Sequence, residues 1–134
     1  MELKKSYRGL VLWMLVFLAG MTGICLLPME DGAALTRLMM SWMSVAVALL
    51  AFIIWRTEQV YWYNGTEYEA AVEAGSERRK AFGWKHFRIF GGYALLQVIF
   101  SCVLHLIGAR WWIDIVVTCV GLCAAAFATM PIKL

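Results

Sequence analysis

The sequence predicts an all-α fold: an integral membrane four-helix bundle, with a short amphipathic cytoplasmic helix between the second and third spans. The first supporting observation is the composition of the 134 residues, of which 63% are hydrophobic and 16% charged, against roughly 25% charged in an average soluble domain. The second is a mean hydropathy of +0.72. This balance excludes a disordered chain and a small secreted domain held by disulfides. The length predicts one domain, residues 1–134.

The third observation is four apolar runs, each near the roughly 20 residues that a helix needs to cross a bilayer. The predicted spans cover about residues 9–27, 38–55, 89–108 and 111–130. The first three contain no Asp, Glu, Lys or Arg, and the fourth contains one acid, Asp114. Pro28 and Gly32 predict a turn between the first two spans. The loop 56–88 is the only segment with room for structure outside a membrane.

Basic residues predict the orientation of the chain, because cytoplasmic segments of membrane proteins carry an excess of Lys and Arg. All 12 basic residues except Arg37 and Arg110 fall in the N-terminal segment, the loop 56–88 or the C-terminal segment. Arg37 and Arg110 fall in the two short connections on the other side. We therefore expect both termini and the loop to be cytoplasmic, with the plasma membrane as the site of insertion.

The sequence of the loop 56–88 predicts one helix and one surface that contacts lipid. Thr66 and Glu69 have the spacing of a capping box, which predicts a helix from there to about Phe82. Five basic side chains around the end of that helix interleave with aromatic residues, which is typical of contact with anionic lipid headgroups. They are Arg78, Arg79, Lys80, Lys85 and Arg88. Since membrane topology already accounts for this charge, we expect no nucleic-acid partner.

Polar side chains recur at every fourth residue of the third span, so they share one side of a helix. They are Tyr93, Gln97, Ser101 and His105, and Asp114 and Thr118 offer a matching side on the fourth span. Polar groups facing hydrocarbon are costly, so this polar stripe should face protein or water. The favoured interpretation is hydrogen bonding between helices. The alternative is the lining of a path or binding cavity for a polar solute.

Asp114 allows two interpretations of its own. His105 and Asp114 could meet across the short connection and form a proton relay or a cation site. The structural interpretation is favoured, because Asp114 lies about one turn inside its helix, where a carboxylate suits the helix N-terminus. Arg110 is four residues away and could neutralise it.

Cysteine and methionine offer two further chemistries. Cys25, Cys102, Cys119 and Cys123 form no CxxC motif, which favours small apolar filler over a thiol-redox centre. Met39 and Met43 are one turn apart, and thioethers suit Cu(I), but flexible apolar filler is the favoured role. We therefore predict no metal and no cofactor.

The sequence contains no nucleotide-binding or catalytic motif that we can identify. The leading hypothesis is a non-enzymatic small polytopic membrane protein that acts as an oligomeric or accessory membrane subunit. Its partners would be the lipid bilayer, anionic headgroups, and a second copy or another membrane protein. The alternative is a small homo-oligomeric channel or transporter for a polar solute or ion. A membrane thiol-redox protein ranks third.

Overall fold

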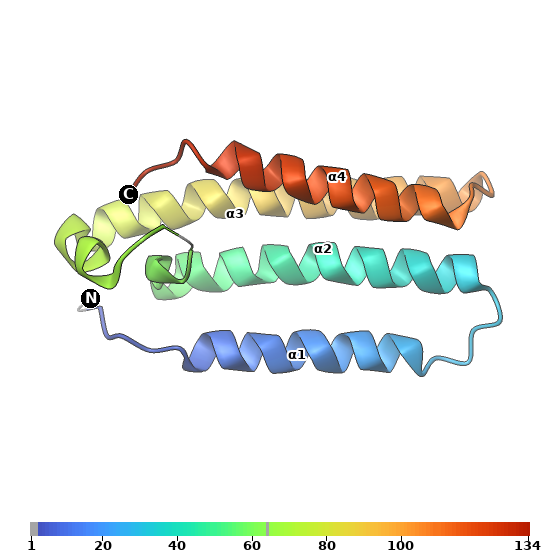
Figure 1. The fold of residues 1–134 in the computed structure, drawn as a ribbon, viewed down its shortest axis with the longest axis horizontal. Helices are drawn as coiled ribbons and strands as arrows, with labels where there is room; N and C mark the ends of the chain where they lie inside the picture. The colour runs from blue at the N-terminus through green and yellow to red at the C-terminus, as the bar shows by residue number, and fades with distance from the viewer. Residues whose placement is uncertain (1–2, 64) are drawn as a thin grey trace.

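The computed structural model describes residues 3–63 and 65–134, and it is helical with no strand in those ranges. Four long helices follow one another in antiparallel order (Figure 1): α1 (Arg8–Cys25), α2 (Gly32–Thr57), α3 (Tyr68–Leu106) and α4 (Trp111–Thr129), with a short 3-10 helix η1 (Val60–Trp62) after α2. Each long helix is long and apolar enough to cross a membrane. The predicted helical class and the number of apolar helices are therefore confirmed.

The bundle has two different ends (Figure 1). We call one the hairpin end, because the connections 26–31 and 107–110 lie there. We call the other the terminal end, because residues 3–7, 58–63, 65–67 and 130–134 lie there. An even number of long antiparallel helices brings both ends of the chain to the same side.

The second helix begins earlier than the sequence predicts. The side chain of Asp31 accepts a hydrogen bond from the backbone N–H of Ala33 at 2.9 Å, which satisfies one of the free donors at a helix start. Helix α2 therefore begins at Gly32 rather than near residue 38, and Arg37 lies within it. At the other end, Glu58 closes the helix with a left-handed backbone, φ 60°.

The third helix also differs from the prediction. We expected a loop helix that ends near Phe82, but the range of α3, Tyr68–Leu106, consists of two helical segments that meet at a kink at Gly75, where φ is 76° and ψ is 166°. That conformation suits glycine, which lacks a Cβ. The predicted capping box is wrong: Glu67 is the N-cap residue and no side chain caps this helix. No residue after Gly75 interrupts the helix, so the segment continues directly into the third apolar run.

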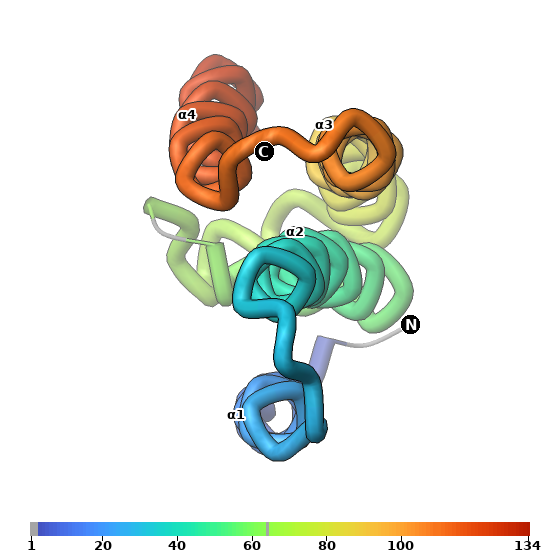
Figure 2. Tube along the Cα trace, turned by 90° about the vertical axis from the view of Figure 1, so that its right-hand side faces the viewer, coloured from blue at the N-terminus to red at the C-terminus, as the bar shows by residue number. Residues whose placement is uncertain are grey.

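The helices α2, α3 and α4 pack together, and α1 lies to one side, against α2 (Figure 2). Helix α1 has no buried residue. Two indole groups connect it to α2: Trp13 Nε1 donates to the carbonyl of Ala46 at 2.8 Å, and Trp42 Nε1 donates to that of Phe17 at 3.2 Å. Gly20 makes room for the second indole, since a Cβ there would lie 2.3 Å from the Trp42 ring.

The main apolar core lies at the terminal end, where Ile54, Val60, Tyr61, Ala71 and Phe82 form a buried cluster. The N-terminal segment is attached to this cluster by hydrogen bonds. The Tyr61 hydroxyl donates to the carbonyl of Ser6 at 2.9 Å, and the Tyr68 hydroxyl donates to that of Leu3 at 2.7 Å. The terminal end is thus an ordered aromatic layer that supports the start of α3.

Candidate functional site

The predicted polar stripe of α3 is turned toward the other helices of the bundle, except at its end, where His105 is exposed. The Tyr93 hydroxyl donates to the carbonyl of Thr118 at 2.9 Å and lies 3.1 Å from the Ser44 hydroxyl. Gln97 Nε2 donates to Thr118 Oγ1 at 2.8 Å. Each of these bonds joins α3 to α2 or α4. Tyr93, Gln97 and Thr118 are therefore brought together as the sequence predicts.

Asp114 is the centre of the stripe at the hairpin end, and it is fully buried. Ser101 Oγ donates to its Oδ1 at 2.5 Å. Arg37 Nε donates to its Oδ2 at 3.0 Å, which forms an ion pair between α2 and α4. The partner of Asp114 is therefore Arg37, which the sequence places in a connection, and not Arg110, which is exposed at the N-cap of α4.

Arg37 has further partners around the carboxylate. Its Nη2 donates to the carbonyl of Ala109, and its Nη1 lies 3.4 Å from Nδ1 of His105. His105 therefore contacts Arg37, and no hydrogen bond joins it directly to Asp114 in the described residues. The Asp31 cap explains the difference, because it starts α2 early and carries Arg37 into the bundle opposite the start of α4.

The hairpin-end network satisfies its own polar groups. A buried charge is costly unless it is paired and hydrogen-bonded. Here the guanidinium and the carboxylate neutralise each other, and the remaining carboxylate oxygen accepts from Ser101. Among the described residues, the buried side-chain atoms without a hydrogen-bond partner lie elsewhere, on Gln59 and Tyr63. The network can hold α2, α3 and α4 in register, and its polar atoms already have hydrogen-bond partners within the protein.

A second buried ion pair lies at the terminal end. Arg79 donates from Nε and Nη2 to Oε2 of Glu58 at 3.1 and 2.9 Å, and Ser76 donates to Oε1 at 2.9 Å. Burial raises the pKa of Glu58, but hydrogen bonds from Ser76 and Arg79 and the positive charge of Arg79 and Lys80 outweigh it, so the pKa is lowered. This pair connects the end of α2 to α3.

The position of Arg79 corrects a prediction. We expected its side chain at lipid headgroups, but it is 3% exposed and is occupied with Glu58 and the carbonyl of Ala71. The other four predicted headgroup residues are exposed and stay predictions: Arg78, Lys80, Lys85 and Arg88. Arg79 turns inward because it pairs with Glu58, an acid 21 positions away, and this pairing does not follow from local composition.

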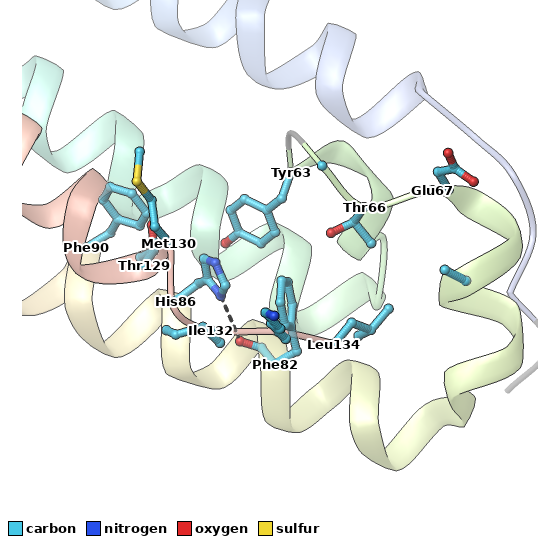
Figure 3. Close-up of a pocket in the computed structure, with 13 residues that line it drawn as sticks. Tyr63, Thr66, Glu67, Phe82, His86, Phe90, Thr129, Met130, Ile132 and Leu134 are labelled. Carbon is cyan, nitrogen blue, oxygen red and sulfur yellow. Dashed lines mark hydrogen bonds between the residues drawn. The ribbon is translucent and has the colours of Figure 1, made fainter.

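A cavity of about 750 Å³ also lies at the terminal end (Figure 3). Its wall comes from residues 65–67, from α3 and from the segment 129–134. Tyr63 stacks on His86 with ring centroids 4.3 Å apart. The Tyr63 hydroxyl is buried without a hydrogen-bond partner. Burial raises the pKa of Tyr63 and lowers that of His86, whose hydrogen bond to the carbonyl of Phe82 opposes part of the effect.

Sequence reasoning missed this cavity. Tyr63 lies in a connecting loop and His86 within a basic run, so neither pattern set them apart. The pairing depends on the fold of three segments that are far apart in the chain. The one available signal was the position of His86 among aromatic residues, on the side of α3 that faces the bundle.

The cysteines and methionines do not converge. The four cysteines are free and exposed on the helices, while Met39 and Met43 are half-buried on α2. In the described part of the chain, no group of three or more His, Cys, Asp or Glu side chains could hold a metal ion.

The chain matches no known protein family, and it has no significant similarity to a curated protein or to a solved structure. The class that the fold defines is a helical protein with four helices apolar enough to cross a membrane.

Proposed function

We propose that the protein is a non-enzymatic integral membrane protein, and that it acts as an oligomeric or accessory membrane subunit. The observation that carries this proposal is the use of the polar stripe. Gln97, Ser101 and Asp114 are all buried and bonded across helices. Such bonds join neighbouring helices within a membrane, so the stripe serves assembly of the bundle rather than passage of a solute.

The peripheral position of α1 supports contact with a second copy. Ala19 and Gly23 lie one turn apart on the exposed surface of α1, and nothing lies within 4 Å of a Cβ added at Gly23. Small residues at this spacing let two membrane helices approach closely. The α2 contact uses Trp13 and Gly20, and Gly23 lies at the open edge of that contact, in a groove that Gly20 and Trp42 also line. The Ala19–Gly23 surface is therefore available to a partner helix.

The exposed basic residues support the membrane orientation that we propose, with the terminal end in the cytoplasm. Arg78, Lys80, Lys85 and Arg88 are exposed on α3 near that end. Each basic residue near an anionic membrane surface contributes about 1 kcal/mol to attraction. The terminal end would then rest against the inner leaflet of the plasma membrane.

Cross-linking in native membranes tests the proposal. In a background with the four cysteines replaced by alanine, Ala19→Cys should give a dimer band with a thiol cross-linker. Leu18→Cys is the matched control: the residue is exposed at the same depth but lies on another side of α1. Equal cross-linking at both positions would indicate random collision, and absence of any cross-linked species would exclude the oligomer.

A channel or transporter is the second candidate, and one observation favours it. A groove of about 420 Å³ between α2 and α3 is lined partly by Arg37, Ser101 and His105. This transport hypothesis predicts that His105→Ala or Gln97→Ala abolishes flux in vesicles while the protein remains assembled. Our leading proposal predicts instead that these variants loosen the bundle in detergent. The thiol-redox hypothesis would require that replacement of all four cysteines destroys activity.

A further inference from the structure

The cavity at the terminal end has the build of a ligand site. Its volume of about 750 Å³ lies within the range of about 300–1,000 Å³ that is typical of small-molecule pockets. Phe82 and Phe90 contribute aromatic surface, and Met130, Ile132 and Leu134 contribute aliphatic surface. Figure 3 shows these side chains around a common space with Tyr63 and His86. The walls therefore suit a flat, mostly apolar group.

Two neutral polar groups meet in this wall. His86 Nδ1 lies 3.0 Å from the Phe82 carbonyl, which only accepts hydrogen bonds, so Nδ1 carries the proton. In neutral imidazole the other nitrogen, Nε2, is then an acceptor. Figure 3 shows this nitrogen on the side of the ring away from the bond to Phe82. Tyr63 supplies the complementary donor, because its buried hydroxyl has no partner in the described residues.

The charged side chains of the cavity lining cancel. They are one acid and one base, Glu67 and Lys133, and both are exposed. An anionic headgroup would need a surplus of basic groups, and a cation a surplus of acids. A neutral ligand needs no surplus of either charge.

From these features we propose that the cavity binds a neutral amphiphile whose planar ring carries a hydroxyl or carbonyl group, of the quinol and quinone class. A ring carbonyl accepts from the Tyr63 hydroxyl, and a ring hydroxyl donates to His86 Nε2. The ring lies against Phe82 or Phe90, and an apolar tail leaves toward the membrane. The proposal concerns binding alone and does not depend on the oligomeric role of α1.

Nitrogen NMR of the histidines tests this assignment directly. The chain has two histidines, so full-length protein with ¹⁵N-labelled imidazoles in lipid nanodiscs gives two residue-specific sets of signals. Titration with a decyl-substituted benzoquinol should shift the signal of His86 Nε2 saturably. The His105 signals should stay in place, because that ring contacts Arg37 on α2 at the hairpin end. Saturation without a change at His86 would overturn the site.

Three variants sharpen the test. Tyr63→Phe keeps the stacked ring and removes the donor, and it should weaken binding of the corresponding benzoquinone about fivefold, since one neutral hydrogen bond contributes about 1 kcal/mol. Tyr7→Phe is the matched control, because Tyr7 is exposed outside the cavity. Ala70→Trp fills the cavity from an exposed lining position and should abolish binding.

A ringless alcohol provides the last comparison. Decanol carries a similar tail and a hydroxyl but no ring, so it should bind at least tenfold more weakly than the benzoquinol. Equal binding of decanol would overturn the ring preference. Binding that survives both Tyr63→Phe and Ala70→Trp unchanged would indicate partition into lipid and would overturn the proposal.

Discussion

Two buried arginine–carboxylate pairs lie at opposite ends of the bundle, and they join different helices. Arg37–Asp114 joins α2 to α4 across 77 positions at the hairpin end. Arg79–Glu58 joins α3 to the end of α2 across 21 positions at the terminal end. All four residues are at most 7% exposed. The long-range pair holds α2 against α4, two helices that are far apart in the sequence. The shorter-range pair holds the end of α2 against α3, the next long helix in the chain.

The surroundings of the two pairs differ as well. At the hairpin end, the charges and hydroxyls satisfy one another. At the terminal end, Lys80, which is 60% exposed, connects Glu58 to the solvent side, and Tyr63 nearby keeps a hydroxyl without a partner. This contrast indicates that the buried polar residues of the apolar helices stabilise the fold. The groups left free for a ligand lie where the helices end.

Breaking the hairpin-end pair should have the largest effect. Asp114→Leu leaves the Arg37 guanidinium buried without its carboxylate, which typically costs about 3–5 kcal/mol. Denaturant titration in detergent micelles should show this loss of unfolding free energy. The double variant Arg37→Met with Asp114→Leu should recover most of it. A double variant as unstable as the single one would contradict the role of the pair.

Breaking the terminal-end pair should cost less, because Lys80 Nζ lies 3.6 Å from Oε1 of Glu58 and still pairs with the carboxylate. Arg79→Met removes two charge-assisted hydrogen bonds to Glu58, and we expect a loss of about 1.5–3 kcal/mol. The same titration measures it. A loss larger than that of Asp114→Leu would reverse the order that we assign to the two ends.

Close packing of α3 on α2 gives a third comparison. A Cβ at Gly83 would lie 2.9 Å from the Cα of Trp55, which cannot move aside as a side chain can. Gly83→Ala should therefore cost about 1–3 kcal/mol through overpacking. Gly92→Ala on the same helix meets nothing within 4 Å, so it should be neutral or stabilising by up to about 1 kcal/mol. Equal effects of the two would contradict the packing at Gly83.

Acidification should weaken the terminal end specifically. The folded-state pKa of Glu58 lies below its ordinary value of 4.5. Glu58 therefore stabilises the fold above that ordinary value, and the stabilisation is lost as the pH falls through the folded pKa. Glu58→Gln should reduce the pH dependence of the melting temperature between pH 6 and pH 3. An unchanged profile would show that the carboxylate is not the titrating group.

The attachment of α1 should give the smallest effect. Trp13→Phe keeps the aromatic contact with Phe17 and removes the hydrogen bond to Ala46. We expect a loss of about 1 kcal/mol, together with faster hydrogen exchange in α1 and little change in α3 and α4. Uniform destabilisation of all four helices would show that α1 is part of the same cooperative unit.

Much of the bundle could be predicted because its signals are local. The apolar runs and their breaks predict four helices, and four-residue spacing puts Tyr93, Gln97 and Ser101 on one side of α3. The partner of Asp114 could not be predicted in this way. The apolar run places Arg37 in a connection, whereas the cap at Asp31 starts α2 early enough to include it. Only packing of α2 on α4 brings the two charges together.

By itself the sequence determined the helical class, the apolar length of each helix and the side of α3 that is polar, because these follow from periodicity and composition along short segments. Tertiary structure alone decided that Arg37 neutralises Asp114, that Arg79 turns inward to Glu58, and that Tyr63 and His86 share a cavity. The physical reason is distance along the chain. Burial and pairing of a charge depend on which remote segment packs against it, and no local pattern records that choice.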